Sequence, residues 1–467
     1  MSEPRPFTSP KKRLGRALFV VALCLLGAFL VLAFRGGRSA SAERRAQLRA
    51  RGERLSVAEL LPRDRVTNEV AEPIKSITRV APKIAVISSM GGRGEKPPDP
   101  VGFRRPGFDQ PRLFGYAGSV IEWEDARRTK AGLEADFGEL HEALAAPLHD
   151  PGWSYPATTP RVSEMVAKRQ IAQALGDAIL LELHDGNRAA ALEHLLDLCR
   201  LVRVHDEGWT LVNQMIRVAL SGLAVDLAWE ALQMPGWTEP ELASLQRHLD
   251  APMLVPDLEK AFAMERASSL EWFDDMRRKP RAQPGLPGLQ ALFQNGLVLP
   301  IWRIAWADRD ELLYLDQLQT ALDTLRGLSD GRSYRSLVPR LTDSRTDFER
   351  KASGAAGFRY VGCRTVLPGY GKAIETLVKN ETLRQLALAG LGVQRFRIRH
   401  GRAPDTLEAL TPEFVARLPI DLFSGRPVLI KPSSSHPNPL LYSVGRNFLD
   451  DQGAADLDLV WPIPAPP

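Results

Sequence analysis

Apolar residues recur at helical spacing through the middle of the chain. Between residues 163 and 184 they fall at Met165, Ile171, Leu175, Ile179 and Leu183. Four similar runs cover residues 188–206, 209–233, 238–249 and 257–278, and Gly or Pro lies in each break between runs. Because short connections make successive helices pack antiparallel, the pattern predicts an irregular helical bundle or a short solenoid.

Helices are also predicted on either side of this region. A charged helix is expected after residue 43 and is interrupted at Gly52, and Ser56 and Glu59 have the spacing of a capping box for a second short helix. Residues 310–328 and 371–400 predict two long helices. The stretch 90–161 contains so many Gly and Pro residues that we expect an irregular region.

The pattern changes after His400. Gly401 suits a helix C-terminus that needs a positive φ, and Pro404 prevents the helix from continuing. Asp405 is expected to cap a short helix over 406–410. Residues 428–430, 440–444 and 456–461 then predict short strands, so the chain is expected to end in an α+β module with a small antiparallel sheet.

An uncharged run of 18 residues, Ala17 to Phe34, precedes all of these elements. As a helix it would be about 27 Å long, close to the hydrocarbon thickness of a bilayer. Basic residues flank the run on both sides. We interpret it as a transmembrane helix; the alternatives are a cleaved signal peptide and a buried core helix.

The expected organisation is therefore mainly α-helical and sequential. The segments are a basic cytoplasmic tail (1–16), the transmembrane helix (17–34), a membrane-proximal helical segment (35–89), the irregular region (90–161), a helical domain (162–370), a helix with a small sheet (371–461) and a Pro-rich tail (462–467). A short basic tail favours the cytoplasm, which places the long C-terminal part outside it. However, seven arginines in 35–54 oppose this orientation, so local charge alone does not decide it.

The charge balance argues against nucleic acid as a partner. The net charge of the chain is +5, and residues 1–54 alone carry 12 Lys and Arg against 3 Glu. The rest of the chain is therefore slightly acidic, whereas a nucleic-acid-binding domain needs its basic residues on the folded surface. Beside a bilayer, these basic residues are suited to anionic lipid headgroups.

The order of features near the C-terminus resembles a known family. A helix is followed by HGRAPDTLEAL, LPIDLFSGRPV, LLYSVGRNFLDDQG and DLDLVW. This order, over residues 380–461, resembles the C-terminal part of the major pseudopilins of type II secretion. The anchor and helical middle also resemble large membrane-anchored bacterial proteins of planctomycete type. The chain departs from a pseudopilin because Gly15 is followed by RALFVV, without the glutamate of the processing motif.

The resemblance implies a calcium site. In pseudopilins the loop between the last strands binds calcium through carboxylates and carbonyl oxygens, and the matching residues here are Asp450, Asp451, Asp456 and Asp458. The family's acidic position after Ser-x-Gly is replaced by Arg446-Asn447-Phe448. An acidic surface loop without metal is the alternative, and no other cofactor is expected.

Candidate catalytic motifs have simpler structural interpretations. The pairs His149-Asp150, His184-Asp185 and His205-Asp206 resemble the His-Asp pair that metal-dependent phosphohydrolases place on a helix. However, the second and third pairs fall at predicted helix ends, where histidine complements the helix dipole. Six tryptophans between residues 209 and 306 are expected to be core or groove-lining residues. Cys24, Cys199 and Cys363 allow at most one disulfide.

The sequence thus predicts a single-pass protein of the inner membrane. Its helical domain is expected to bind a protein partner in the cell envelope, outside the cytoplasm, without catalysing a reaction. Two alternatives remain open: an accessory component of a secretion or pilus-like assembly, and an envelope hydrolase whose site is built from distant residues.

Overall fold

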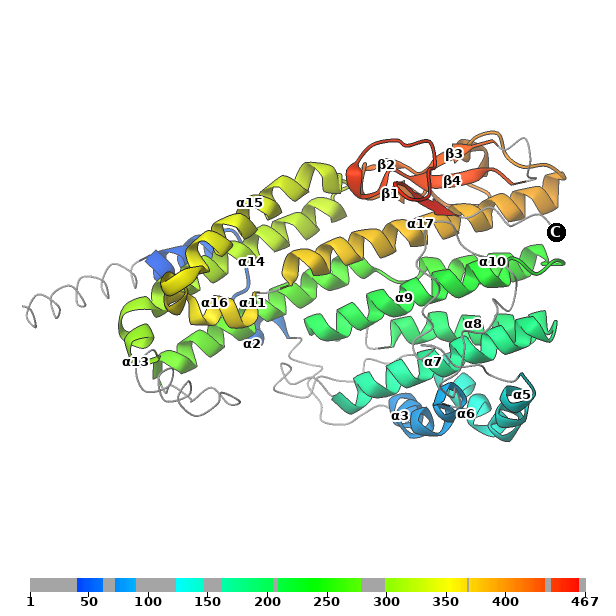
Figure 1. The fold of residues 1–467 in the computed structure, drawn as a ribbon, viewed down its shortest axis with the longest axis horizontal. Helices are drawn as coiled ribbons and strands as arrows, with labels where there is room; N and C mark the ends of the chain where they lie inside the picture. The colour runs from blue at the N-terminus through cyan, green and yellow to red at the C-terminus, as the bar shows by residue number, and fades with distance from the viewer. Residues whose placement is uncertain are drawn as a thin grey trace, which may run out of the picture. The chain divides into compact units, whose positions relative to one another are not determined.

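The chain is described by a computed structural model for residues 40–61, 72–89, 123–146, 162–204, 209–278, 299–367, 369–432 and 438–461. The predicted tail, transmembrane helix and Pro-rich C-terminus lie outside these ranges. The mainly helical fold with a small C-terminal antiparallel sheet is confirmed (Figure 1).

The chain forms two compact units that are not sequential. Unit 1 comprises Met1–Glu59, Arg266–Thr320 and Thr342–Gly369, and unit 2 comprises Leu60–Glu265, Ala321–Leu341 and Tyr370–Pro467. The predicted boundary at residue 370 therefore does not separate a helical domain from a C-terminal module. Instead, the last long helix packs in the same unit as the central helices.

Unit 2 is a stack of helices with a sheet on one face. Its helices include α3 (Glu72–Ile84), α4 (Val86–Ser89), α5 (Trp123–Gly132), α6 (Glu134–Ala145), α7 (Val162–His184), α8 (Arg188–Arg203), α9 (Leu211–Ala231), α10 (Glu239–Asp250) and α17 (Tyr370–His400). Helix α17 packs on α9 and α10, these pack on α8, α8 packs on α7, and α3 and α6 complete the stack (Figure 1).

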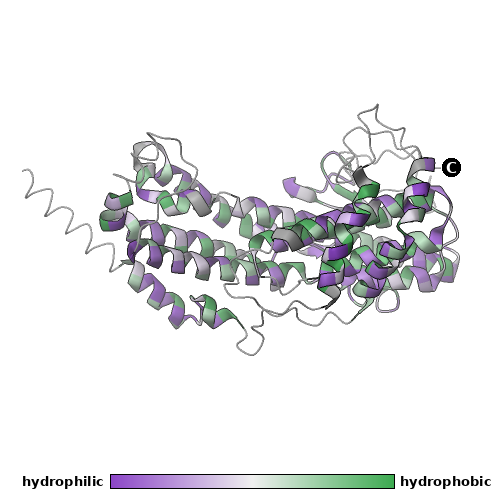
Figure 2. Cartoon of the chain, turned by 90° about the horizontal axis from the view of Figure 1, so that it is seen from below, coloured by the Kyte–Doolittle hydropathy of each residue, from purple (hydrophilic) through white to green (hydrophobic). Residues whose placement is uncertain are grey.

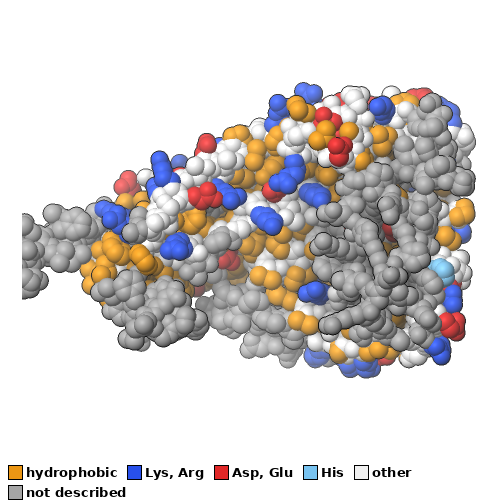
Figure 3. Space-filling model, viewed as in Figure 1, with side chains coloured by type: hydrophobic (Ala, Val, Ile, Leu, Met, Phe, Trp, Pro, Cys, Tyr) orange, Lys and Arg blue, Asp and Glu red, His pale blue; other side chains and the backbone are white. Residues whose placement is uncertain are grey.

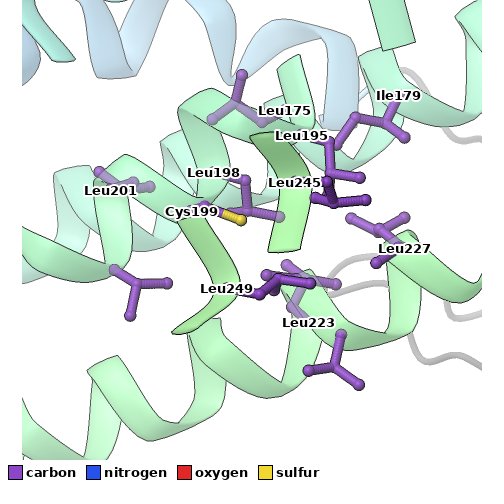
Figure 4. Close-up of a cluster of buried hydrophobic side chains, with 14 of the residues drawn as sticks. Leu175, Ile179, Leu195, Leu198, Cys199, Leu201, Leu223, Leu227, Leu245 and Leu249 are labelled. Carbon is purple, nitrogen blue, oxygen red and sulfur yellow. The ribbon is translucent and has the colours of Figure 1, made fainter. Parts of the chain in front are cut away.

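The core of unit 2 is aliphatic. Figure 4 shows side chains from α7, α8, α9 and α10 converging on one another, with Leu175, Leu198 and Leu245 among them. Each of these three leucines is fully buried. Burial of one leucine side chain contributes about 1.5–3 kcal/mol, so this layer is the main source of stability between the helices. Along most helices polar and apolar residues alternate around the axis, as helices with one buried face require (Figure 2).

Helix α9 also has the length and apolar composition of a membrane span, and 61% of its apolar window is buried inside the protein. Its side chains pack in the core of unit 2. This burial is typical of a core helix.

Several predicted helix ends are confirmed. Helix α7 spans the predicted residues, Gly186 adopts a φ of +79°, and Thr238 with Glu241 forms the capping box of α10. Helix α11 (Leu254–Arg278) begins three residues before the predicted run over 257–278 and ends with it. Asn187 precedes α8, but its side chain donates to Glu182 Oε2 at 2.8 Å and does not cap α8.

The prediction of an irregular region over 90–161 is wrong for residues 123–146. These residues form α5 and α6, and Phe137 and Leu140 of α6 are buried against the core. The two helices were not predicted because charged residues outnumber the apolar residues of their short buried faces. Lys130, for example, is buried and pairs with Glu182 at 2.8 Å, although a lysine at this position is expected from sequence to be exposed to solvent.

The C-terminal sheet covers α17. Strands β3 (Leu429–Lys431), β4 (Leu440–Ser443) and β5 (Leu459–Trp461) are antiparallel in the order β3-β4-β5, and β1 (Ile420–Asp421) pairs with β2 (Arg426–Pro427). The last strand is shorter than predicted because 456–458 form a turn. The short helix after His400 is the 3₁₀ turn η4 (Leu407–Leu410), which Thr406 precedes, so Asp405 is not its cap.

Unit 1 is smaller. It contains a helix over 40–50, α2 (Val57–Leu60), the end of α11, α13 (Leu299–Ile301), the π-helical turn η2 (Trp302–Trp306), much of α14 (Ala307–Ser329), the end of α15 (Tyr334–Ala352), η3 (Gly354–Tyr360) and α16 (Val361–Val366). Arg45 joins the first helix to α14 through Glu311 at 2.5 Å and to α11 through Asp274 at 3.0 Å. The predicted break at Gly52 is confirmed by its φ of +84°.

Candidate functional site

A pocket of about 320 Å³ opens in unit 2 between α10, α17 and the segment 412–419. We call it the α10–α17 pocket. Its lining residues are Ala243, Gln246, Arg247 and Asp250 of α10, Gln385, Leu388 and Arg395 of α17, and Pro412, Glu413, Phe414, Val415, Ala416, Arg417 and Pro419. The pocket is therefore a charged hollow with an apolar floor.

Arg395 holds the three walls of this pocket together. Its guanidinium donates to Glu239 Oε1 at 2.6 and 2.9 Å, to Gln246 Oε1 at 2.6 Å and to the carbonyl oxygen of Phe414 at 3.1 Å. It also lies 5.6 Å from the centre of the Phe414 ring, a cation–π distance. One side chain thus fixes α10 and the segment 412–419 against α17.

Close backbone approach shapes the floor of the pocket. A Cβ on Gly392 of α17 would lie 3.1 Å from Val415 Cγ1, so a larger residue here would require the Val415 side chain to shift by a few tenths of an ångström. The Gln246 side chain donates to the carbonyl oxygen of Leu388 at 3.1 Å and is buried. The floor is consequently rigid.

The charges around the pocket fall into two groups. Two carboxylates are already engaged: Asp250 pairs with Arg384 at 3.1 Å, and Glu413 pairs with Arg399. Arg247 and Arg417 are exposed, and we find no ion pair between either of them and a described carboxylate. Two guanidinium groups are therefore available to an incoming anionic group.

Arginine side chains dominate the charge of the α10–α17 pocket. Arginine forks bind carboxylates and phosphates in a bidentate manner. The pocket lining thus combines three arginines with two carboxylates, Asp250 and Glu413, and both carboxylates are engaged in ion pairs.

The predicted calcium loop follows β4. Asp451 Oδ2 accepts from the Asn447 amide at 2.6 Å, and Asp450 Oδ1 accepts from the backbone N–H of Gln452 at 2.9 Å. Asp458 Oδ2 accepts from the N–H of Gly453 at 2.7 Å, whereas Asp456 is exposed. Three of the four predicted carboxylates therefore accept hydrogen bonds from other residues of this loop.

Asp458 is the least satisfied of these carboxylates. The residue is 4% exposed, and its Oδ1 atom is buried without a hydrogen-bond partner. Burial, with smaller contributions from Asp451 and Asp450, raises the pKa of Asp458. Burial and Asp450 also raise the pKa of Tyr442 to about 12. A cation would relieve both effects, although no three His, Cys, Asp or Glu side chains in the described ranges already form a metal-ligand group.

The histidine–aspartate pairs do not assemble a site in the described part. Asp185 forms an ion pair with Arg127 at 2.6 Å, and this arginine lowers the pKa of the Asp185 carboxyl. His184 ends α7 as predicted, and His149-Asp150 and His205-Asp206 lie outside the described residues. His194 packs on Phe137 at 5.2 Å, and its burial lowers its pKa, as expected for a core histidine.

The tryptophans are divided between the units. Trp229 is buried in unit 2, and Trp302 is buried in unit 1 with Trp272 and Phe273 around it. They do not form one cage. Cys199 and Cys363 are both buried free thiols.

Comparison with protein-family models, curated proteins and solved structures finds no match to the chain. The resemblance to pseudopilins therefore stays a prediction.

The α10–α17 pocket was not predicted from the sequence. Its arginines come from three places: Arg247 from α10, Arg395 from α17 and Arg417 from the segment between Pro412 and Pro419. The available signal was the segment PEFVARLP, in which two prolines bracket apolar residues after a basic helix end. That signal indicates a segment packed on the helix but does not identify α10 as the third wall.

Proposed function

We propose that this protein is a membrane-anchored, non-enzymatic protein of the bacterial envelope whose unit 2 binds an acidic segment of a partner protein. The apolar run Ala17–Phe34, with basic residues on both sides, supports the anchor. The helical stack supports an interaction role because stacked helices offer rigid grooves. The folded part is proposed to lie outside the cytoplasm.

One observation carries the proposed interaction. Arg247 and Arg417 border a rigid hollow whose carboxylates are already paired, so an incoming carboxylate meets an excess of positive charge. Phe414, Val415 and Leu388 add apolar contact area beside the charges. A segment that combines acidic and apolar residues is complementary to this surface.

Photo-crosslinking in cells tests the proposal. A photoreactive amino acid replaces Ala416, which is exposed at the pocket, and a control chain carries it at Val212, exposed on α9. We expect a discrete adduct from position 416 that the double charge reversal R247E/R417E abolishes. The matched reversal R332E/R340E, at two exposed arginines of unit 2, should leave the adduct intact. An adduct that survives R247E/R417E, or none at position 416, contradicts the proposal.

We also propose calcium as a ligand of the loop that contains Asp450, Asp451 and Asp458. The buried Oδ1 atom of Asp458 supports this proposal because a buried carboxylate oxygen without a partner costs free energy that a cation would recover. Bound calcium would stabilise the loop and the adjoining β4 and β5; it would have no part in a reaction.

A further inference from the structure

One end of unit 1 exposes apolar side chains beside basic ones. Ile304 of η2 is 52% exposed and Phe358 of η3 is 40% exposed, and these are the exposed large apolar side chains among the described residues of unit 1. The two turns are in contact. Trp306 is half-buried with the Arg359 guanidinium 6.0 Å from its ring, and Arg303 is exposed. We call these five residues the η2–η3 surface.

This surface rests on a rigid base. Trp302 is fully buried, and its Nε1–H donates to Asp310 Oδ2 at 2.8 Å. The same carboxylate accepts from the N–H groups of Gly362 at 2.6 Å and Cys363 at 3.0 Å. Asp310 therefore ties the turn η2 to the segment that follows η3. Ile304 is therefore exposed on a turn that these hydrogen bonds hold in place.

The helix over 40–50 begins at the same end of unit 1. It runs alongside α14 in the same direction, since Ser41 Oγ lies 3.4 Å from Asp308 Oδ1 and Arg44 pairs with Asp316 at 2.8 Å. Asp308 is only two residues after Trp306. The start of this helix thus adjoins the η2–η3 surface.

The sequence places the apolar run close to this point. Phe34 ends the run, and six residues of chain, even fully extended, span at most about 22 Å between Phe34 and Ala40. Figure 3 shows hydrophobic side chains gathered at the left of the view, where Figure 1 shows α13 of unit 1. If the run crosses a bilayer, the bilayer surface must lie near this end of unit 1.

We propose that the η2–η3 surface lies in the interfacial region of an anionic bilayer, with Ile304 and Phe358 inserted among the lipids. Tryptophan and arginine are characteristic of this region, the first at the headgroup level and the second on lipid phosphates. Trp306, Arg303 and Arg359 supply both kinds of group around the two apolar side chains. The inference rests on the proposed anchor and adds that unit 1 is held against the lipid surface.

Spin-label accessibility tests this placement in the full chain. Cys24 is replaced by Ser, and one cysteine is introduced as I304C, F358C or R51C; the native Cys199 and Cys363 are buried and are not expected to react. Arg51 is an exposed control in the same unit, about 16 Å along the first helix from Ala40. The labelled chains are reconstituted in nanodiscs of phosphatidylethanolamine with phosphatidylglycerol, and collision rates with oxygen and with a neutral nickel chelate are measured.

We expect the labels at 304 and 358 to collide with oxygen more than with the nickel chelate, and the label at 51 to show the reverse. Nickel accessibility at 304 or 358 equal to that at 51 overturns the inference. Low accessibility to both reagents also overturns it, because it means that protein and not lipid covers the surface. Retention in the membrane fraction after carbonate extraction is measured on the same chains, so loss of the anchor is distinguished from failure of the surface contact.

Discussion

Gly390 allows the sheet to pack closely on α17. A Cβ at this position would lie 2.5 Å from Trp461 Nε1 and 2.9 Å from its Cε2. We expect Gly390→Ala to displace Trp461 and to lower the free energy of unfolding by about 1–3 kcal/mol, despite the better helix propensity of alanine. Chemical denaturation followed by tryptophan fluorescence measures the change.

Gly371→Ala is the matched control because it lies in the same helix and its Cβ would meet nothing within 4 Å. It should be neutral or stabilising by up to about 1 kcal/mol. Equal effects of the two substitutions would mean that Trp461 does not pack on α17 as described.

The raised pKa of Asp458 predicts a pH dependence. The folded protein holds this proton at a pH where the unfolded chain has released it, so the carboxyl makes stability fall as pH rises from its usual 3.8 through the raised pKa. Without calcium, D458N should therefore become more stable relative to the native chain as the pH rises across this window. At pH values above the window, calcium should make the native chain the more stable of the two, since the metal requires the carboxylate.

Thermal unfolding of both chains, with a chelator and with calcium, measures these differences. If calcium shifts the melting temperatures of the native chain and D458N equally, or shifts neither, the calcium proposal is wrong. Parallel pH curves for the two chains would contradict the burial of Asp458.

At the scale of elements, a buried ion pair within α17, Glu381 with Arg384, also fixes this helix to α10, because Arg384 donates to α10 as well. Arg384 is 4% exposed and donates to Glu381 Oε2 and Oε1 at 2.9 and 2.5 Å and to the carbonyl oxygen of Leu249 at 2.9 Å. R384A should cost about 3–5 kcal/mol because it leaves Glu381 buried without its cation. E381L/R384M should recover most of this loss, since no unpaired charge remains.

Equilibrium unfolding of E381L, R384M and E381L/R384M, with the native chain, forms a complete cycle. Additive costs would show that Glu381 and Arg384 do not interact. The pairing also supports the α10–α17 pocket, because Arg384 engages Asp250 at the pocket wall. R384A is therefore expected to reduce the photo-crosslink at position 416 as well.

Helices with long apolar faces were predictable from sequence, and elements with short faces were not. Helix α7 and α17 have the predicted bounds within one residue, since glycine follows each of them and changes the backbone direction. Helices α5 and α6 were missed because their buried residues are few and their surfaces carry ion pairs such as Arg79 with Glu139. Strand β5 was predicted too long because Asp456 and Asp458 alternate with leucines as in a strand, although they lie in the turn before it.

At the scale of the whole molecule, the sequence predicted the helical class but not the grouping of its segments. Segments of the two units alternate along the sequence, because contacts within a unit, such as Arg266 with Glu53 at 2.8 Å in unit 1, join residues more than 200 positions apart. The α10–α17 pocket was unpredictable for the same reason: Gln246 and Leu388, 142 positions apart, form one floor. Local periodicity carries no information on such pairings.

We propose above all that a membrane anchor holds the folded units outside the cytoplasm. Carbonate extraction of membranes, combined with protease treatment of intact cells and of spheroplasts, tests it directly. We expect the chain to stay in the extracted membranes, to resist protease in intact cells and to be digested in spheroplasts. Release by carbonate would contradict the anchor, and resistance to protease in spheroplasts would place both units in the cytoplasm.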